Sequence, residues 1–99
     1  MLESSVEKAF LDAVTKNGDL CFKIKILGIA GYPDRIVFFK GGGFMWMELK
    51  RPGHEPRKLQ LHRMKQLRGY KHAVYWADTS EKAIEYYETE KYVQTRKTS

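Results

Sequence analysis

Residues 31–50 read GYPDRIVFFKGGGFMWMELK, two apolar runs separated by three glycines. The runs 36–39 and 44–49 have the length and composition of short β-strands. Gly41-Gly42-Gly43 between them supplies the positive φ angles that a tight turn requires. The sequence therefore predicts an antiparallel hairpin at the centre of the fold.

Three charged side chains stand at the open end of this hairpin: Asp34 on the first strand, and Glu48 and Lys50 on the second. Because side chains alternate across a strand, Glu48 and Lys50 point to the same face. A three-residue loop would pair Lys40 with Phe44 and Asp34 with Lys50, which brings Asp34 to the face of Glu48. A two-residue loop would place Asp34 on the other face unless a bulge intervened. The sequence alone leaves both registers open.

The chemistry of the three groups is that of phosphodiester hydrolysis. Two neighbouring carboxylates repel each other and are stabilised by a shared hard cation, for which oxygen ligands favour Mg²⁺ or Mn²⁺. A lysine beside them can orient or deprotonate an attacking water and stabilise the negative charge of the transition state. Asp34, Glu48 and Lys50 are therefore the candidate catalytic residues.

Pro33-Asp34 followed by Glu48-Leu49-Lys50 resembles the pattern of PD-(D/E)XK nucleases. Gly31-Tyr32-Pro33-Asp34, the run ELKRP at 48–52 and the downstream Gln60 resemble the VRR-NUC branch of that superfamily, in its stand-alone phage and bacterial form. The resemblance extends from about residue 3 to the helix after Asp78. It implies a metal held by Asp34, Glu48 and the backbone carbonyl of Leu49, with Gln60 in a supporting role.

The first helix is predicted over residues 4–17, with Val6, Phe10 and Val14 on its apolar face and Gly18 as its end. In the resembling superfamily an acidic residue of this helix completes the metal site, and Glu7 fits best, with Glu3 as the other candidate. Glu7 has a second interpretation, since Ser4-Ser5-Val6-Glu7 is also a capping box.

The net charge of +6 and the sequence pI near 9.5 suit an acidic partner, and nucleic acid is the usual one. Candidate phosphate contacts lie in the segment 20–27, in the loop with two prolines after Lys50 and in the helix that follows it: Lys25, Arg51, Arg57, Lys58 and Arg63. Candidate exposed aromatics for contact with DNA are Tyr32, Phe44, Trp46, Tyr86 and Tyr87. The single cysteine, Cys21, excludes an intrachain disulfide and is expected in the core.

The remaining pattern predicts strands at 20–27 and 73–77 and helices at 58–68 and after Asp78. In the strand 20–27, Phe22, Ile24 and Ile26 are expected on the buried face. The fold class is thus α/β, a restriction-endonuclease-like core with a mixed four-stranded sheet and the element order α-β-β-β-α-β-α. One domain is predicted over 1–90, followed by a basic polar tail, 91–99, that frays.

These observations favour a Mg²⁺- or Mn²⁺-dependent DNA endonuclease. A core of this size has little surface for reading bases, which favours selection by DNA structure. The resemblance points to homodimeric resolution of four-way (Holliday) junctions. Alternatives are a nickase or restriction-type nuclease on ordinary duplex and a non-catalytic basic nucleic-acid-binding module. No apolar run approaches the ~20 residues of a membrane span, so a cytoplasmic location in a bacterium or a phage-infected host is expected.

Overall fold

The computed structural model describes residues 3–96, and within them the predicted order of three helices and four strands is confirmed. The four strands form one sheet in the order β1-β2-β3-β4, in which β4 is parallel to β3 and the other pairs are antiparallel. The elements are α1 Glu3–Lys16, β1 Leu20–Lys23, β2 Arg35–Phe38, β3 Phe44–Leu49, α2 Lys58–Gly69, β4 Val74–Ala77 and α3 Ser80–Arg96.

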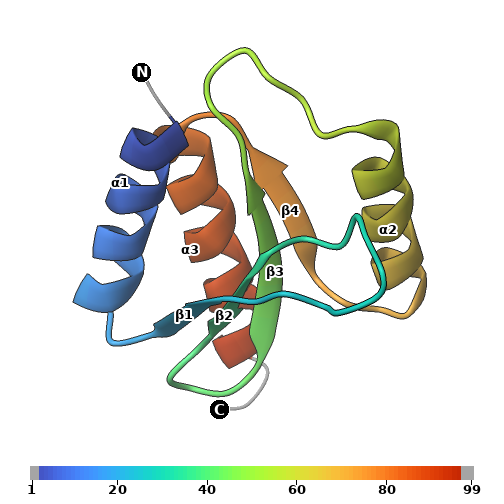
Figure 1. The fold of residues 1–99 in the computed structure, drawn as a ribbon. Coiled ribbons are helices and arrows are strands. Elements are labelled where there is room, and N and C mark those ends of the chain that lie inside the picture. Colours follow the sequence, from blue (N-terminus) through green and yellow to red (C-terminus); the bar gives the residue numbers. More distant parts are fainter. Residues whose placement is uncertain (1–2, 97–99) are drawn as a thin grey trace.

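The sheet separates two layers of helices. α1 and α3 lie side by side against one face, here called the inner face, and α2 lies on the opposite, outer side (Figure 1). The connection between β1 and β2 leaves the sheet and runs across to α2 (Figure 1). The core fills the space between the inner face and the two helices, and its largest fully buried side chains are Tyr87, Phe10, Met45, Met47, Leu49, Val6, Val14 and Val37. Met64 of α2 is fully buried on the outer side. No helix within residues 3–96 is both long and apolar enough to cross a membrane.

The hairpin of β2 and β3 has a three-residue loop, one residue earlier than the glycine run suggested. The Phe39 amide donates to the Gly43 carbonyl at 3.0 Å, so the loop is Lys40–Gly42 and the ladder pairs Phe38 with Phe44. Continuing this register places Asp34 opposite Glu48, whereas the three-residue loop considered from the sequence, one of two open registers, would pair Asp34 with Lys50. The shift keeps Asp34 on the face of Glu48, because a three-residue loop preserves the alternation of side chains in either position.

A buried carboxylate explains where the loop begins. The side chain of Asp19 accepts a hydrogen bond from the Lys40 amide at 2.8 Å, which removes Lys40 from the ladder. The same carboxylate accepts from the Tyr87 hydroxyl and forms an ion pair with Lys91 at 2.8 Å. Asp19 thereby ties the end of α1, the hairpin loop and α3 together.

β1 is shorter than predicted, and its two faces are exchanged. The strand ends at Lys23, and Cys21 packs against the core while Phe22 is 48% exposed. The physical reason is the register: Cys21 pairs with Val37 of the inner face, and Phe22 pairs with Ile36 of the outer face. The outer face over β1, β2 and the start of β3 consequently carries a row of aromatic rings, Phe22, Phe38 and Phe44, with neighbouring centroids 6.0 Å apart.

The helix α3 continues to Arg96, so the prediction of a fraying tail from residue 91 is wrong for residues 91–96. Two polar side chains hold this segment in place: Lys91 pairs with Asp19, and the Gln94 amide exchanges hydrogen bonds with both backbone groups of Phe44, at 3.0 and 2.8 Å. The part of the predicted tail at 97–99 lies outside the described residues.

Candidate functional site

Asp34, Glu48 and Lys50 gather on the outer side of the sheet, where β2 begins and β3 ends. The Asp34 amide donates a hydrogen bond to Oε1 of Glu48 at 3.3 Å. Nζ of Lys50 lies 3.5 Å from Oε2 of the same glutamate. The structure therefore brings together the three residues that the hairpin pattern predicted, with Glu48 between the other two.

The first turn of α2 supplies a fourth member, Gln60. Its Oε1 accepts a hydrogen bond from the Arg57 amide at 2.8 Å, which fixes the orientation of the side-chain amide. Its Nε2 then donates to Oε2 of Glu48 at 3.4 Å. Since Gln60 and Glu48 are both buried, this contact joins the helix on the outer side to the end of β3.

Glu48 is 6% exposed, and burial raises the pKa of its carboxyl above the usual value. The negative charge of Asp34 acts in the same direction, whereas Lys50 and the Asp34 amide lower the pKa and offset part of the increase. A buried carboxylate beside a second carboxylate is an electrostatic cost that a bound cation would remove. The donor set thus has the chemistry of a hard-metal site.

The protein atoms available to such a metal are few. No group of three or more His, Cys, Asp and Glu side chains converges on one point within residues 3–96. Asp34 and Glu48 form a pair, and the chain can add the neighbouring carbonyl of Leu49. This fits Mg²⁺ or Mn²⁺ better than a cation that needs an all-protein cage, because Mg²⁺ keeps several of its waters.

Glu7 does not join this group in the structure. Its Oε2 lies 3.0 Å from a guanidinium nitrogen of the buried Arg35. Arg35 pairs with Met47 in the ladder and therefore faces α1 on the inner side, away from the face of Glu48. The alternation that places Asp34 outward also places Arg35 inward, so the sequence held a signal for this ion pair. The side chains of Glu3 and Ser4, the other candidate and the capping partner, lie outside the described part.

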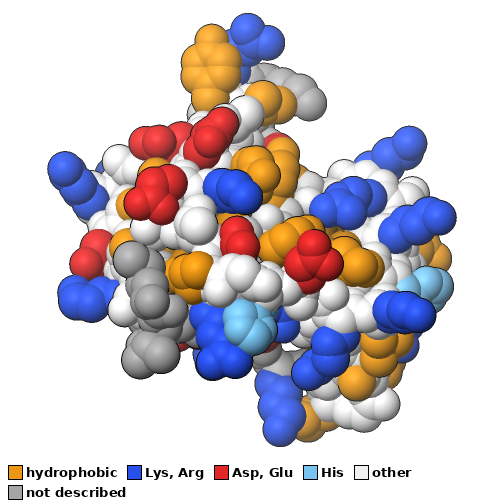
Figure 2. Space-filling model, turned by 90° about the horizontal axis from the view of Figure 1, so that it is seen from above, with side chains coloured by type: hydrophobic (Ala, Val, Ile, Leu, Met, Phe, Trp, Pro, Cys, Tyr) orange, Lys and Arg blue, Asp and Glu red, His pale blue; other side chains and the backbone are white. Residues whose placement is uncertain are grey.

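The predicted phosphate contacts divide into exposed and engaged cations. Lys25, Arg57 and Lys58 are exposed. Arg51 is exposed as well, and its Nε donates to Nε2 of His54 at 2.7 Å. Arg63 is partly buried: its Nε donates to the Ala30 carbonyl at 3.1 Å, and its guanidinium lies 5.0 Å from the ring centroid of Tyr32. Figure 2 shows Lys and Arg side chains gathered over the side of the molecule where α2 lies.

The aromatic residues expected at the surface are less accessible than predicted. Tyr87 is fully buried and packs against Phe10 and Phe39, so its prediction as a DNA contact is wrong. The sequence pattern did not predict the hydrogen bond from the Tyr87 hydroxyl to the buried Asp19. The other four are partly buried: Tyr32, Phe44, Trp46 and Tyr86.

Comparison with known proteins finds similarity both in sequence and in structure. The chain is 33% identical over 79 residues to "Putative nuclease p44" of Acyrthosiphon pisum secondary endosymbiont phage 1, an alignment that covers 80% of this chain and 85% of the phage protein. It also superimposes on a solved structure described as a VRR_NUC domain, with a TM-score of 0.80 and 23% sequence identity, over 87% of this chain and 94% of that structure. A scan of protein-family models finds no match.

Proposed function

Because the chain belongs to the VRR-NUC family of nucleases, we propose that it is a Mg²⁺- or Mn²⁺-dependent DNA endonuclease with a PD-(D/E)XK active site. The observation that supports this proposal best is the pairing of Asp34 and Glu48 beside Lys50. Glu48 is buried against a second carboxylate, and among the described residues its one ion pair is with the Lys50 ammonium, at 3.5 Å. A divalent cation between the carboxylates and a phosphate would complete that balance.

Each residue has a distinct task in this proposal. Asp34 and Glu48 would hold the metal, together with the Leu49 carbonyl, and a metal bound there would supply Lewis acidity and lower the pKa of a water beside it. Lys50 leaves its ion pair with Glu48 and orients the attacking water, then stabilises the negative charge that develops on the phosphate. Gln60 keeps Glu48 in place and can bond the water or the scissile phosphate. Glu7 acts on Arg35 in the inner layer, and its direct participation stays a prediction.

From the elements that lie next to the site, we infer that the protein selects its substrate by shape. The outer side next to the site carries α2 and the β1–β2 connection (Figure 1), and no further helix or ribbon among the described elements is positioned to enter a DNA groove. We therefore place four-way junctions first among the substrates, cut by a homodimer whose two-fold symmetry presents one site to each of two strands. The exposed apolar side chains of Leu20, Phe22 and Phe38 on the outer face offer a surface for such a dimer.

Two alternatives compete with junction resolution. A nickase or a restriction-type nuclease would use the same site on ordinary duplex. A non-catalytic nucleic-acid-binding module would keep the basic surface of Arg57 and Lys58 and leave Glu48 and Lys50 as a plain ion pair. A cytoplasmic location, in a bacterium or in the host of a phage, goes with any of these functions.

The deciding experiment incubates the protein with a synthetic four-way junction and with a linear duplex of matched sequence, each in Mg²⁺, Mn²⁺ or a chelator. We expect paired cuts in the junction that require metal. Equal cutting of both substrates would support the duplex nuclease, and binding without cleavage in every metal would overturn the proposed active site.

A further inference from the structure

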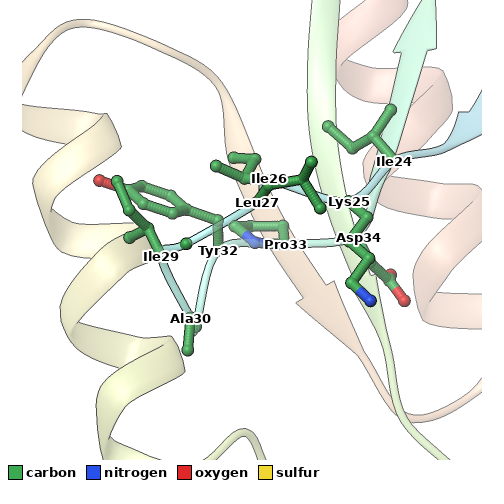
Figure 3. A pocket seen from close by; sticks show the side chains of 11 residues that line it. Ile24, Lys25, Ile26, Leu27, Ile29, Ala30, Tyr32, Pro33 and Asp34 are labelled. Atoms are coloured by element: carbon green, nitrogen blue, oxygen red, sulfur yellow. The ribbon is translucent and has the colours of Figure 1, made fainter.

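The connection from β1 to β2, residues 24–34, places aliphatic side chains on the surface. Its turn exposes three aliphatic side chains: Leu27 is 81% exposed, Ile29 49% and Ile26 37%. The same segment lines a pocket of about 610 Å³, with Ile24, Tyr32 and Pro33 among its walls (Figure 3). A volume of this order is typical of pockets that hold a small organic group.

Residues 30–32 of the segment pack against α2, although the turn before them is exposed. The Tyr32 hydroxyl donates to Gln66 of α2 at 2.6 Å, and Arg63 of the same helix reaches both the Ala30 carbonyl and the Tyr32 ring. Gly31 lies so close to α2 that an added Cβ would meet Leu59 at 2.7 Å. Anchoring the chain next to the exposed Ile29 reduces the conformational entropy that this part of the segment would lose on binding a partner.

The pocket and the candidate active site share one residue. Asp34 lies at the end of the pocket next to Lys25, while Ile29 and Tyr32 lie at the other end, close to α2 (Figure 3). The backbone supports this closeness, since the Ile24 amide donates to the Asp34 carbonyl at 2.6 Å. Whatever fills the pocket therefore lies beside the carboxylates at which a phosphate must bind.

From this arrangement we infer that the pocket receives a nucleobase of the DNA substrate that is unpaired at the branch point, next to the scissile phosphate. A base presents a flat apolar surface to Leu27, Ile29 and the Tyr32 ring, and its phosphate lies toward Lys25. A protein segment bound in this pocket would lie against Asp34 and block the binding of the substrate. A nucleotide of the substrate itself would not, and it is therefore the favoured occupant. The inference rests on the proposed function, because pocket and metal site meet at Asp34.

The test uses a DNA duplex with one unpaired 2-aminopurine, a fluorescent base, and the same duplex with that base paired. Ca²⁺ replaces Mg²⁺ to measure binding without cleavage. We expect the wild-type protein to bind the bulged duplex about ten-fold more tightly and to change its fluorescence. The variant Leu27→Ser/Ile29→Ser should lose this preference and retain its affinity for paired DNA. Val93→Ser, a partly exposed aliphatic residue of α3 on the other layer, is the matched control.

Several outcomes would overturn the inference. One is an unchanged preference for the bulge in the double variant; another is an equal loss in the control. A third is conversion of a dimer to a monomer by Leu27→Ser/Ile29→Ser, measured by sedimentation, because the segment would then be a protein interface. Failure of the nuclease proposal is a separate result: it is the absence of cleavage by the wild-type protein in Mg²⁺ or Mn²⁺, and the binding assay does not depend on it.

Discussion

Glu48 experiences opposing demands at a single carboxylate. Burial and Asp34 raise the pKa of Glu48, so its ionised form destabilises the metal-free protein. The ionised form is nevertheless the one that binds metal. A raised pKa means that the folded state binds the proton more tightly, so the stability from protonated Glu48 is present below its ordinary pKa and is lost as pH rises through the folded value.

We therefore expect Glu48→Gln to unfold at a Tm equal to or above that of the wild-type protein at neutral pH without metal, and the difference to disappear toward acid pH. The variant should lose the increase in Tm that Mg²⁺ or Mn²⁺ gives the wild-type protein, and its cleavage should fall on the order of a hundred-fold or more. Thermal scans at several pH values and a cleavage assay measure these effects. Cleavage at the wild-type rate would show that Glu48 is not a metal ligand.

The role of Lys50 can be tested separately from that of the two carboxylates. Since it holds no metal in the proposed mechanism, Lys50→Ala should leave the metal-dependent increase in Tm in place while cleavage falls on the order of a hundred-fold. Calorimetric titration with Mn²⁺ and single-turnover cleavage give the two readouts. Turnover at the normal rate would leave Lys50 with a structural role as the partner of Glu48.

At the scale of elements, the first turn of α2 is linked to the site through Gln60. Gln60→Ala removes the acceptor of the Arg57 amide and the donor to Glu48, so we expect a loss of about 1 kcal/mol in the free energy of unfolding. Metal affinity should fall about 10- to 100-fold, as is usual when a residue that orients a ligand is removed. Urea denaturation and metal titration measure the two effects; a change in stability without any change in metal affinity would contradict the link.

The β1–β2 connection offers a matched pair of glycines. Gly28 and Gly31 both have positive φ, +80° and +95°, but nothing lies within 4 Å of a Cβ added to Gly28. Gly28→Ala should cost about 1–2 kcal/mol for the left-handed backbone. Gly31→Ala should cost about 1–3 kcal/mol more, since it also displaces Leu59. Equal costs in denaturant titrations would show that the segment is not packed against α2.

At the scale of the whole molecule, Asp19 joins segments far apart in the chain. Burial alone would raise the pKa of Asp19, but the hydrogen bonds from Lys91, Tyr87 and the Lys40 amide outweigh it and leave the pKa below its usual value. The resulting stability is therefore present above the ordinary pKa and is lost as pH falls through the folded value. Asp19→Asn should lower the free energy of unfolding by about 1.5–3 kcal/mol at neutral pH. The wild-type and variant values should converge in acid, and parallel urea titrations would show a constant gap if this assignment were wrong.

The sequence predicted the element order from local periodicity, and alternation along one strand predicted that Glu48 and Lys50 share a face. Whether Asp34 joins them depended on the hairpin register, which the sequence left open, and the place of Gln60 at the site was implied by the family resemblance. The catalytic roles of these four residues stay predictions. The faces of β1 could not be predicted by alternation, since none of the described helices covers its outer side and aromatic residues stay exposed there. The end of α3 was missed because its anchors are polar and distant in sequence: Lys91 on Asp19, and Gln94 on Phe44.

The aromatic row Phe22, Phe38 and Phe44 has a consequence for how the protein behaves in the laboratory. Concentrated salt is the usual means of stripping nucleic acid from a basic protein, since it weakens phosphate contacts. Sulfate and phosphate salts also strengthen the association of exposed apolar surface, and β1 at the edge of the sheet adds unpaired backbone groups to that surface. Purification in ammonium sulfate therefore favours precipitation of this protein, and sodium chloride at moderate concentration is the milder choice.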